Sequence, residues 1–184
     1  MRAIDVLMEE HRVIERVLDS LEAGAARLAR GEPVRPGFFL DVADFATHFA
    51  DGCHHQKEEG VLFPVMTEHG VPARGGAIEM MLHEHDEGRA YVRQLREAAR
   101  RLDAGDGAAV TPLVAAAKGY AALLRDHIAK EDEVVFPMAG EMIPDSAHDA
   151  VMAQFDRVEH TGAGTHAHAD LLALARRLQT EAST

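Results

Sequence analysis

Apolar residues recur every three or four positions through most of the chain, which is the spacing of amphipathic helices. The first such run covers 3–30. His11 falls on its apolar stripe between Leu7 and Ile14, so we expect the imidazole ring to point inward. Glycines and prolines at 31–37 end the run, because both residue types interrupt helices.

The same pattern predicts three more long helices, which begin near Phe38, Ala77 and Ala108. Pro64 is expected to kink or end the second of them, because proline lacks a backbone donor and clashes with the preceding turn. The third, over 77–102, carries His85 inside its apolar stripe. Glycine-containing loops are predicted between the helices, at 69–76 and 103–107.

The last part of the chain has a different pattern. A short helix is predicted over 147–160, a flexible break at 161–165, and a final amphipathic helix from 166 to about 179. We therefore expect an all-α protein with two parts. These are a helical bundle at 1–140 and a C-terminal helical extension at 141–184, which packs on the bundle or on a partner chain.

One motif occurs twice. HHQKEEGVLFP at 54–64 and HIAKEDEVVFP at 127–137 align so that His54 matches His127 and Glu58 matches Glu131. A histidine precedes each copy at a nearly constant offset, on the helix before it. Two helix pairs repeated in this way predict an antiparallel up-down four-helix bundle with pseudo-twofold symmetry, whose inward polar residues meet in the middle.

The repeated polar residues have the chemistry of metal ligands. Residues four apart share a helix face, so each histidine–glutamate pair can grip one ion or bridge two. Burying imidazoles and carboxylates in an apolar bundle is costly unless something pairs them. The predicted ligands are His11, His54, Glu58, His85, His127 and Glu131. We expect two ions, each held by two histidines and bridged by the glutamates, and these ligands suit iron, manganese or zinc.

Neighbouring residues leave some alternatives open. His55 and Glu59 are also four apart, but the second copy has Ile128 and Asp132 at these places. We therefore place His55 and Glu59 around the ligands or at the surface, with a ligand role for one of them as the alternative. Cys53 is expected to be a small, partly buried residue, and redox reactivity is its alternative. A bundle whose histidines face inward without a metal is the competing interpretation of the whole set.

Composition narrows the class of partner. The chain of 184 residues has a net charge of −12, which argues against nucleic acid or an anionic membrane as a partner. No uninterrupted apolar run reaches the roughly 18 residues that span a bilayer. The N-terminal MRAIDVLMEEH does not have the pattern of a signal peptide. A single cysteine fits a reducing compartment, so we expect a cytoplasmic protein.

The order of these motifs resembles the hemerythrin-like HHE cation-binding family. The matching elements are EEH at 9–11, HHQKEEGVLFP at 54–64, EHD at 84–86 and HIAKEDEVVFP at 127–137, and the resemblance covers about 3–140. It implies two non-haem iron ions with oxo or hydroxo and carboxylate bridges. The four histidines would be terminal ligands and the two glutamates bridges. Oxygen carriers of the family have a further histidine on the third helix, where this chain has Met81 and Arg89.

That difference makes simple oxygen carriage less expected than the roles of bacterial relatives. We predict a protein, monomeric or homodimeric, that binds dioxygen, nitric oxide or peroxide for sensing, scavenging or stress response. The alternatives are an enzyme that acts on peroxide or nitric oxide or repairs iron–sulfur clusters, and an iron-storage or interaction module. Aligning His11 with His85 sets Ile14 opposite Gly88, so we expect the small ligand on the Gly88 side.

Overall fold

The computed structural model describes residues 3–162 and 168–182, and every regular element within these ranges is a helix. The longest helices are α1 (Ala3–Ala29), α4 (Ala77–Asp103) and α5 (Val110–Lys130). The shorter α-helices are α2 (Phe38–Phe45), α3 (Phe63–Glu68), α6 (Phe136–Met142), α7 (His148–Gly162) and α8 (His168–Ala182). Single 3₁₀ turns occur at η3 (Gly107–Ala109) and η5 (Asp145–Ala147). The predicted all-α class is confirmed.

Wider π-helical turns join some of these helices into longer segments. They are η1 (Ala46–His55) and η2 (Glu58–Leu62) between α2 and α3, and η4 (Glu131–Val135) between α5 and α6. The N–H groups of Phe63 and Phe136 donate to the carbonyls of Glu58 and Glu131, five residues back. A proline follows each phenylalanine, and the widened turn accommodates its missing donor. The helical segment thus does not end at Pro64 but continues to Glu68.

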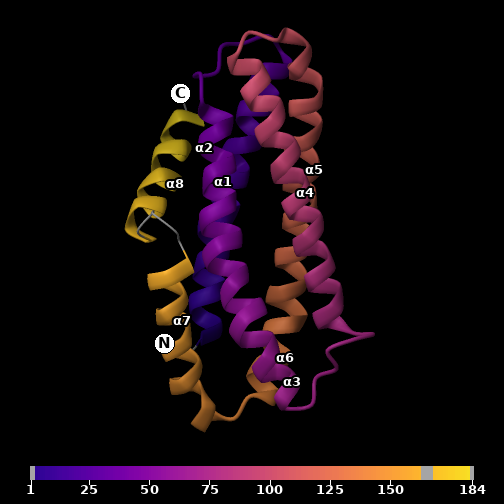
Figure 1. The fold of residues 1–184 in the computed structure, drawn as a ribbon, viewed down its shortest axis with the longest axis vertical. Coiled ribbons are helices and arrows are strands. Elements are labelled where there is room, and N and C mark those ends of the chain that lie inside the picture. The colour runs from indigo at the N-terminus through magenta and orange to yellow at the C-terminus, as the bar shows by residue number, and fades with distance from the viewer. Residues whose placement is uncertain (1–2, 163–167, 183–184) are drawn as a thin grey trace.

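Four helical segments lie side by side along the long axis of the molecule (Figure 1). They are α1, the segment from α2 to α3, α4, and the segment from α5 to α6. The most extensive contacts are those of α4 with α5 and of α1 with α5, and α2 also packs against α4. The contacts of α1 with α5 and of α2 with α4 bring the helices of the two sequence repeats against each other, and the contact of α4 with α5 lies within the second repeat.

The core consists of two apolar clusters, one toward each end of the segments. On α1, Leu7 belongs to one cluster and Ile14 to the other, and His11 lies between them. On α4, Met81 and Val92 are divided in the same way. The polar residues singled out in the sequence therefore occupy a layer between two dry regions. In such surroundings, interactions between charges are screened less than they are in water.

Helices α7 and α8 run along one side of the bundle segments (Figure 1). Phe155 of α7 is buried in one apolar cluster and Leu178 of α8 in the other. Helices α7 and α8 thus pack against the preceding helical segments. The predicted break at 161–165 is shorter at its start, because α7 continues to Gly162, and 163–165 lie outside the described residues. The division at residue 140 stays a prediction.

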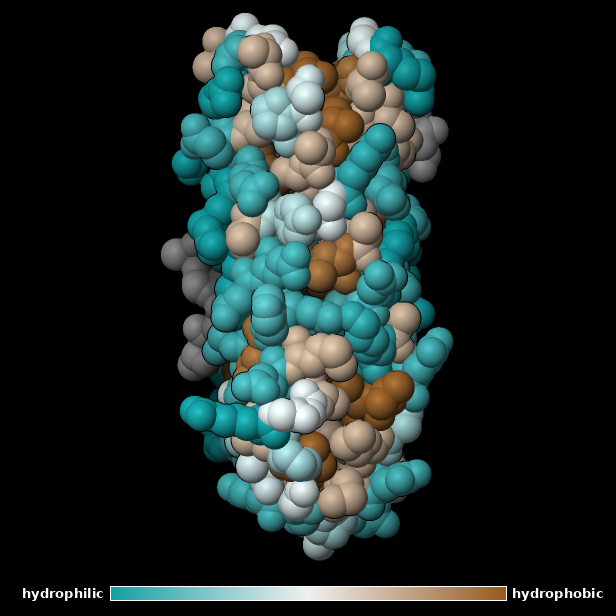
Figure 2. Space-filling view, turned by 90° about the vertical axis from the view of Figure 1, so that its right-hand side faces the viewer, coloured by the Kyte–Doolittle hydropathy of each residue, from teal (hydrophilic) through white to brown (hydrophobic). Residues whose placement is uncertain are grey.

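The face that carries α4 and α5 is mostly hydrophilic, with small, separated hydrophobic areas (Figure 2). By length and composition alone, the stretch Gly107–Met142 could cross a membrane. Its apolar residues Leu113, Leu124 and Phe136 are buried in the core, and it also carries the buried Glu131. A helix that contributes to the core of a helical protein satisfies the same criterion.

Candidate metal centre

The structure brings all six predicted ligands together in the layer between the two apolar clusters. Each has at most 1 % of its surface exposed. Four different segments supply them: α1 carries His11, the segment from α2 to α3 carries His54 and Glu58, α4 carries His85, and the segment from α5 to α6 carries His127 and Glu131. Both glutamates stand at the first position of a π turn, so the two sequence repeats present their carboxylates from the same local geometry.

Each carboxylate connects histidines from both halves of the sequence. Glu58 lies 3.4 Å from Nε2 of His54 and 3.5 Å from Nε2 of His85. Glu131 lies 3.1 Å from Nε2 of His11 and 3.3 Å from Nε2 of His127. A carboxylate placed between two imidazoles in this way can bridge two metal ions, which is the arrangement predicted from the repeat.

The potential ligand atoms form two overlapping groups, within each of which all atoms lie within 4.8 Å of one another. One group contains His11, His54, Glu58 and Glu131, and the other contains His55, Glu58, His85 and His127. Glu58 belongs to both groups. Two adjacent ion positions that share a carboxylate fit this division.

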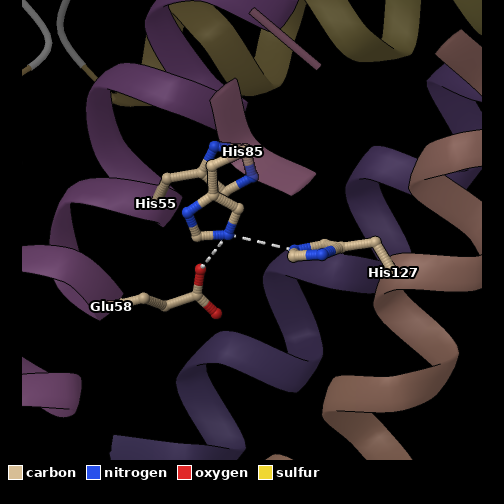
Figure 3. A group of neighbouring side chains, drawn as sticks. All are labelled: His55, Glu58, His85 and His127. Carbon is tan, nitrogen blue, oxygen red and sulfur yellow. Dashed lines mark hydrogen bonds and ion pairs between the residues drawn. The ribbon is translucent and has the colours of Figure 1, made fainter. Parts of the chain in front are cut away.

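His55 is the member of the second group that the predicted ligand set omitted. Its ring is buried and stacks on that of His85, with ring centroids 3.8 Å apart, beside Glu58 and His127 (Figure 3). Comparison of the two repeats disfavoured His55, because the second copy has an isoleucine there. The adjacent histidine pair in the first copy was the only signal for it. Its partner in that alternative, Glu59, lies outside the two groups and accepts a hydrogen bond from His85.

In every predicted histidine ligand, the outer nitrogen Nδ1 donates a hydrogen bond to a carboxylate. His11 and His85 use the residue that follows the glutamate of the opposite repeat: Asp132 at 2.8 Å and Glu59 at 2.7 Å, respectively. His54 and His127 use the residue that precedes the other histidine of their own repeat: Glu10 at 3.0 Å and Glu84 at 2.9 Å, respectively. The twofold relation in the sequence thus extends to the groups around the ligands.

These four contacts orient the rings and, in the neutral imidazole, favour the proton on Nδ1. A proton held on Nδ1 leaves the lone pair of Nε2 free, and all four Nε2 atoms face the central layer. The carboxylates are themselves held by cations: Lys57 on Glu10, Lys130 on Glu84, Arg12 on Asp132 and Arg89 on Glu59. Imidazoles oriented by hydrogen-bonded carboxylates are typical of metal-binding histidines.

Several buried atoms in this layer have no hydrogen-bond partner among the residues that the structure describes. They are Nε2 of His54, both carboxylate oxygens of Glu58 and Oε1 of Glu131. An unpaired polar atom in the interior costs free energy, and an ionised carboxylate costs more. A cation in contact with these atoms would satisfy all of them, so the residues present fit a pair of metal ions.

The pKa values report how strongly this layer favours positive charge. Burial alone lowers the pKa of His54, but Glu58 and Glu10 outweigh it and raise that pKa to about 10. Burial likewise raises the pKa of Glu131, but His11 and His127 outweigh it and hold the pKa well below its usual range. Protons and metal ions therefore compete for the same nitrogens, and metal binding releases protons.

His55 differs from the other histidines in its electrostatics. Its burial, followed by electrostatic repulsion from the neighbouring His85, lowers its pKa well below the usual value. The ring is therefore neutral, which is the form of imidazole that binds a metal. Its Nδ1 lies 3.4 Å from a carboxylate oxygen of Asp51.

The two sides of the centre differ in packing, as the sequence expectation for Gly88 requires. Ile14 is buried in the core. A Cβ atom at Gly88 would come no closer than 3.8 Å to Tyr120, and Gly88 and His55 line a common cavity of about 470 Å³. Space beside the centre is thus found on the Gly88 side.

Comparison with known proteins agrees with this chemistry. Residues 2–139 match the model of the hemerythrin HHE cation binding domain. The chain is 40 % identical over 87 residues to the iron-sulfur cluster repair protein DnrN of Neisseria gonorrhoeae, which covers 45 % of this chain and 54 % of that protein. It is 28 % identical over 119 residues to the iron-sulfur cluster repair protein YtfE of Dickeya chrysanthemi, covering 62 % of this chain and 54 % of the relative. The chain thus spans just over half the length of these relatives.

Proposed function

The chain belongs to the hemerythrin HHE cation-binding domain family, and from this premise we propose that it is a non-haem di-iron protein that binds a small molecule. Dioxygen, nitric oxide and peroxide are the candidate ligands, and sensing, scavenging or stress response is the role. The observation that carries the proposal is the convergence of four histidine Nε2 atoms and two buried carboxylates, each carboxylate lying between two of the histidines.

The roles of the residues follow from their positions. In this proposal, His11, His54, His85 and His127 would hold the ions as terminal ligands, and Glu58 and Glu131 would bridge them. An antiparallel four-helix bundle is the arrangement that accounts for ligands on four neighbouring segments. Bound iron would supply an open coordination position and the electrons for small-ligand binding, with oxo or hydroxo and carboxylate bridges between the ions.

The chain's own residues would orient the ligands and limit access to them. Glu10, Glu59, Glu84 and Asp132 hold the protons on the Nδ1 atoms, so each imidazole keeps one tautomer. The apolar clusters on both sides exclude water from the layer. The cavity beside Gly88 is the side from which we propose that the small ligand approaches.

A second candidate is repair of iron–sulfur clusters, or turnover of peroxide or nitric oxide at the same centre. The printed names of two relatives favour the repair function. Storage of iron is a third candidate. A binder gives one stoichiometric event with peroxide or nitric oxide, an enzyme gives repeated turnover, and a storage module gives up its metal readily to a chelator.

The cellular setting is part of the proposal. The net charge of −12 disfavours nucleic acid and anionic membranes as partners, and the lone cysteine fits a cytoplasmic location. We propose a monomer or homodimer whose partner is a small molecule. Sedimentation equilibrium of the purified chain measures its oligomeric state.

Metal analysis combined with an optical spectrum tests the main proposal. We expect about two iron ions per chain, as the ligand grouping indicates, and near-ultraviolet charge-transfer bands that azide perturbs. The double variant Glu58→Gln/Glu131→Gln removes the charge of both bridges and should lose the iron. Glu133→Gln, an exposed neighbour on the same segment, is the matched control. A colourless protein that holds only zinc contradicts the proposal.

A further inference from the structure

A cavity of about 470 Å³ lies between η1 and α4, beside the metal centre. One wall is a face of α4 that runs from Gly88 to Arg100, and the other runs from Ala46 to His55. The twelve steps of helix from Gly88 to Arg100 extend about 18 Å. Tyr120 of α5 completes the lining. The volume is in the range of sites that bind small organic molecules.

The cavity carries positive charge on a strongly acidic protein. Four arginines line it, at 89, 93, 96 and 100. Arg89 pairs with Asp51 at 2.7 Å, and Arg96 pairs with Asp44 at 2.6 Å. Within the described residues, Arg93 and Arg100 have no ion-pair partner and are exposed. Two uncompensated guanidinium groups, one turn of helix on either side of Arg96, therefore point to a negatively charged occupant.

The remaining lining is mostly apolar and small. Ala46, Val92 and the ring of Tyr120 are each at most 9 % exposed. Gly88 leaves the inner end open, because its missing side chain would only touch Tyr120 and Leu123 at ordinary contact distances. Asp51 is the one carboxylate among the described lining residues, and Arg89 compensates its charge. The cavity thus combines an apolar floor with an arginine-lined wall.

We propose that this cavity binds a small organic carboxylate with an apolar body. Arg93, Arg96 and Arg100 hold the carboxylate, because guanidinium groups pair with carboxylates through two hydrogen bonds. The apolar body lies over Val92 and Tyr120 and extends toward Gly88. The arginines repel a cationic ligand, and a neutral ligand forms no ion pair with them. The groups that hold the carboxylate are none of the six residues proposed to hold iron, and the candidate ligand His55 lines only the wall of the cavity, so the metal-free protein should bind the carboxylate as well.

Calorimetric titration of the full chain with octanoate tests this proposal. Octan-1-ol and octylamine have the same apolar body with no charge or the opposite charge. We expect one saturable octanoate site, with both analogues weaker by at least about tenfold. Affinity should fall as salt is added, because the guanidinium groups are exposed. The result should be the same before and after the metal is removed with a chelator.

Charge variants locate the site. Arg93→Gln/Arg100→Gln should weaken octanoate binding by about tenfold, and Arg93→Glu/Arg100→Glu should weaken it further. Arg74→Glu, an exposed arginine outside the cavity, is the matched control and should bind as the parent does. Circular dichroism checks that all variants are folded.

Four results would overturn the proposal. These are the absence of octanoate binding, equal binding of octanoate and octan-1-ol, equal losses in the cavity and control variants, and octanoate binding that requires metal. The last result would mean that the carboxylate binds the metal ions directly. Because the metal-free protein is measured as well, failure of the di-iron proposal leaves a distinct signature: octanoate binds, but no iron is found.

Discussion

Lys57 and Glu159 form an ion pair of 2.6 Å that connects the C-terminal extension to the metal centre. The Lys57 side chain has no exposed surface, and its ammonium also contacts Glu10, which holds the Nδ1 proton of His54. A chain of three contacts, through Lys57 and Glu10, therefore connects a residue of α7 to His54, a predicted iron ligand. This relation gives the extension a physical role in the bundle, because a buried ammonium group needs compensating charge.

Glu159→Gln should destabilise the protein through this contact. Lys57 keeps Glu10 but loses the charge of its second partner, and we expect a decrease in the free energy of unfolding of about 1–2 kcal/mol. Chemical denaturation of the metal-free protein measures it. Glu141→Gln is the control, because Glu141 is exposed and has no ion-pair partner among the described residues. Equal stabilities of the two variants would show that the pair contributes nothing.

Glu84→Gln should weaken metal binding without removing a ligand. Glu84 accepts the Nδ1 proton of His127 and also contacts Lys130. Loss of the Glu84 charge makes the Nε2 atom of His127 a weaker electron-pair donor to a metal ion. Such changes typically cost about 10–100-fold in metal affinity. Competition with a chelator measures the affinity. Glu87→Gln on the same helix is exposed and should leave it unchanged. An affinity equal to the parent's would contradict the orienting role.

The sequence repeat was sufficient to select the six residues that the structure brings together, because a pair four apart is a local property of a helix. The all-α class followed from periodicity for the same reason. The carboxylates around the ligands were harder to predict from the sequence. Glu10 and Glu84 each precede a histidine, but their contacts are made to histidines of other segments, and only the packing of the helices decides that pairing.

His55 shows the limit of reasoning from a repeat. The comparison of the two copies favours shared residues, so it disfavours a residue present in one copy alone. The position of His55 depends on its stacking against His85 of α4, which is a contact between segments. The widening of the helix around Glu58 and Glu131 was also missed, since hydropathy patterns do not distinguish a π turn from an α turn.

His55→Ala should lower the affinity for one of the two ions. The potential ligand atoms of His55, Glu58, His85 and His127 all lie within 4.8 Å of one another, and the other group does not include His55. Metal analysis after dialysis against a chelator should find one ion retained and the second reduced. His69→Ala, whose ring bonds the carbonyl of Val65 away from the centre, is the control. Two fully retained ions would show that His55 is not a ligand.

Cys53 should be unreactive in the folded protein. It has no exposed surface, and burial, followed by the charge of Glu10, raises the pKa of its thiol to about 12. Below that pH the neutral thiol persists, so alkylation by iodoacetamide at pH 7–9 should be slow. Its rate should not rise with pH across this range, as the rate of a free thiol does. Mass spectrometry follows the reaction, and the protein unfolded in guanidinium is the control. Rapid labelling of the folded chain would favour the redox alternative.

Gly88→Leu should obstruct the approach of a small ligand to the centre. A Cβ atom fits at this position, so the backbone need not move, and the larger side chain occupies part of the cavity shared with His55. We expect the iron content to be retained and the affinity for azide, measured by optical titration, to fall by at least about tenfold. Gln94→Leu adds the same side chain at an exposed position of α4 and should have no effect. If Gly88→Leu binds azide as well as the parent does, the ligand reaches the ions from another side.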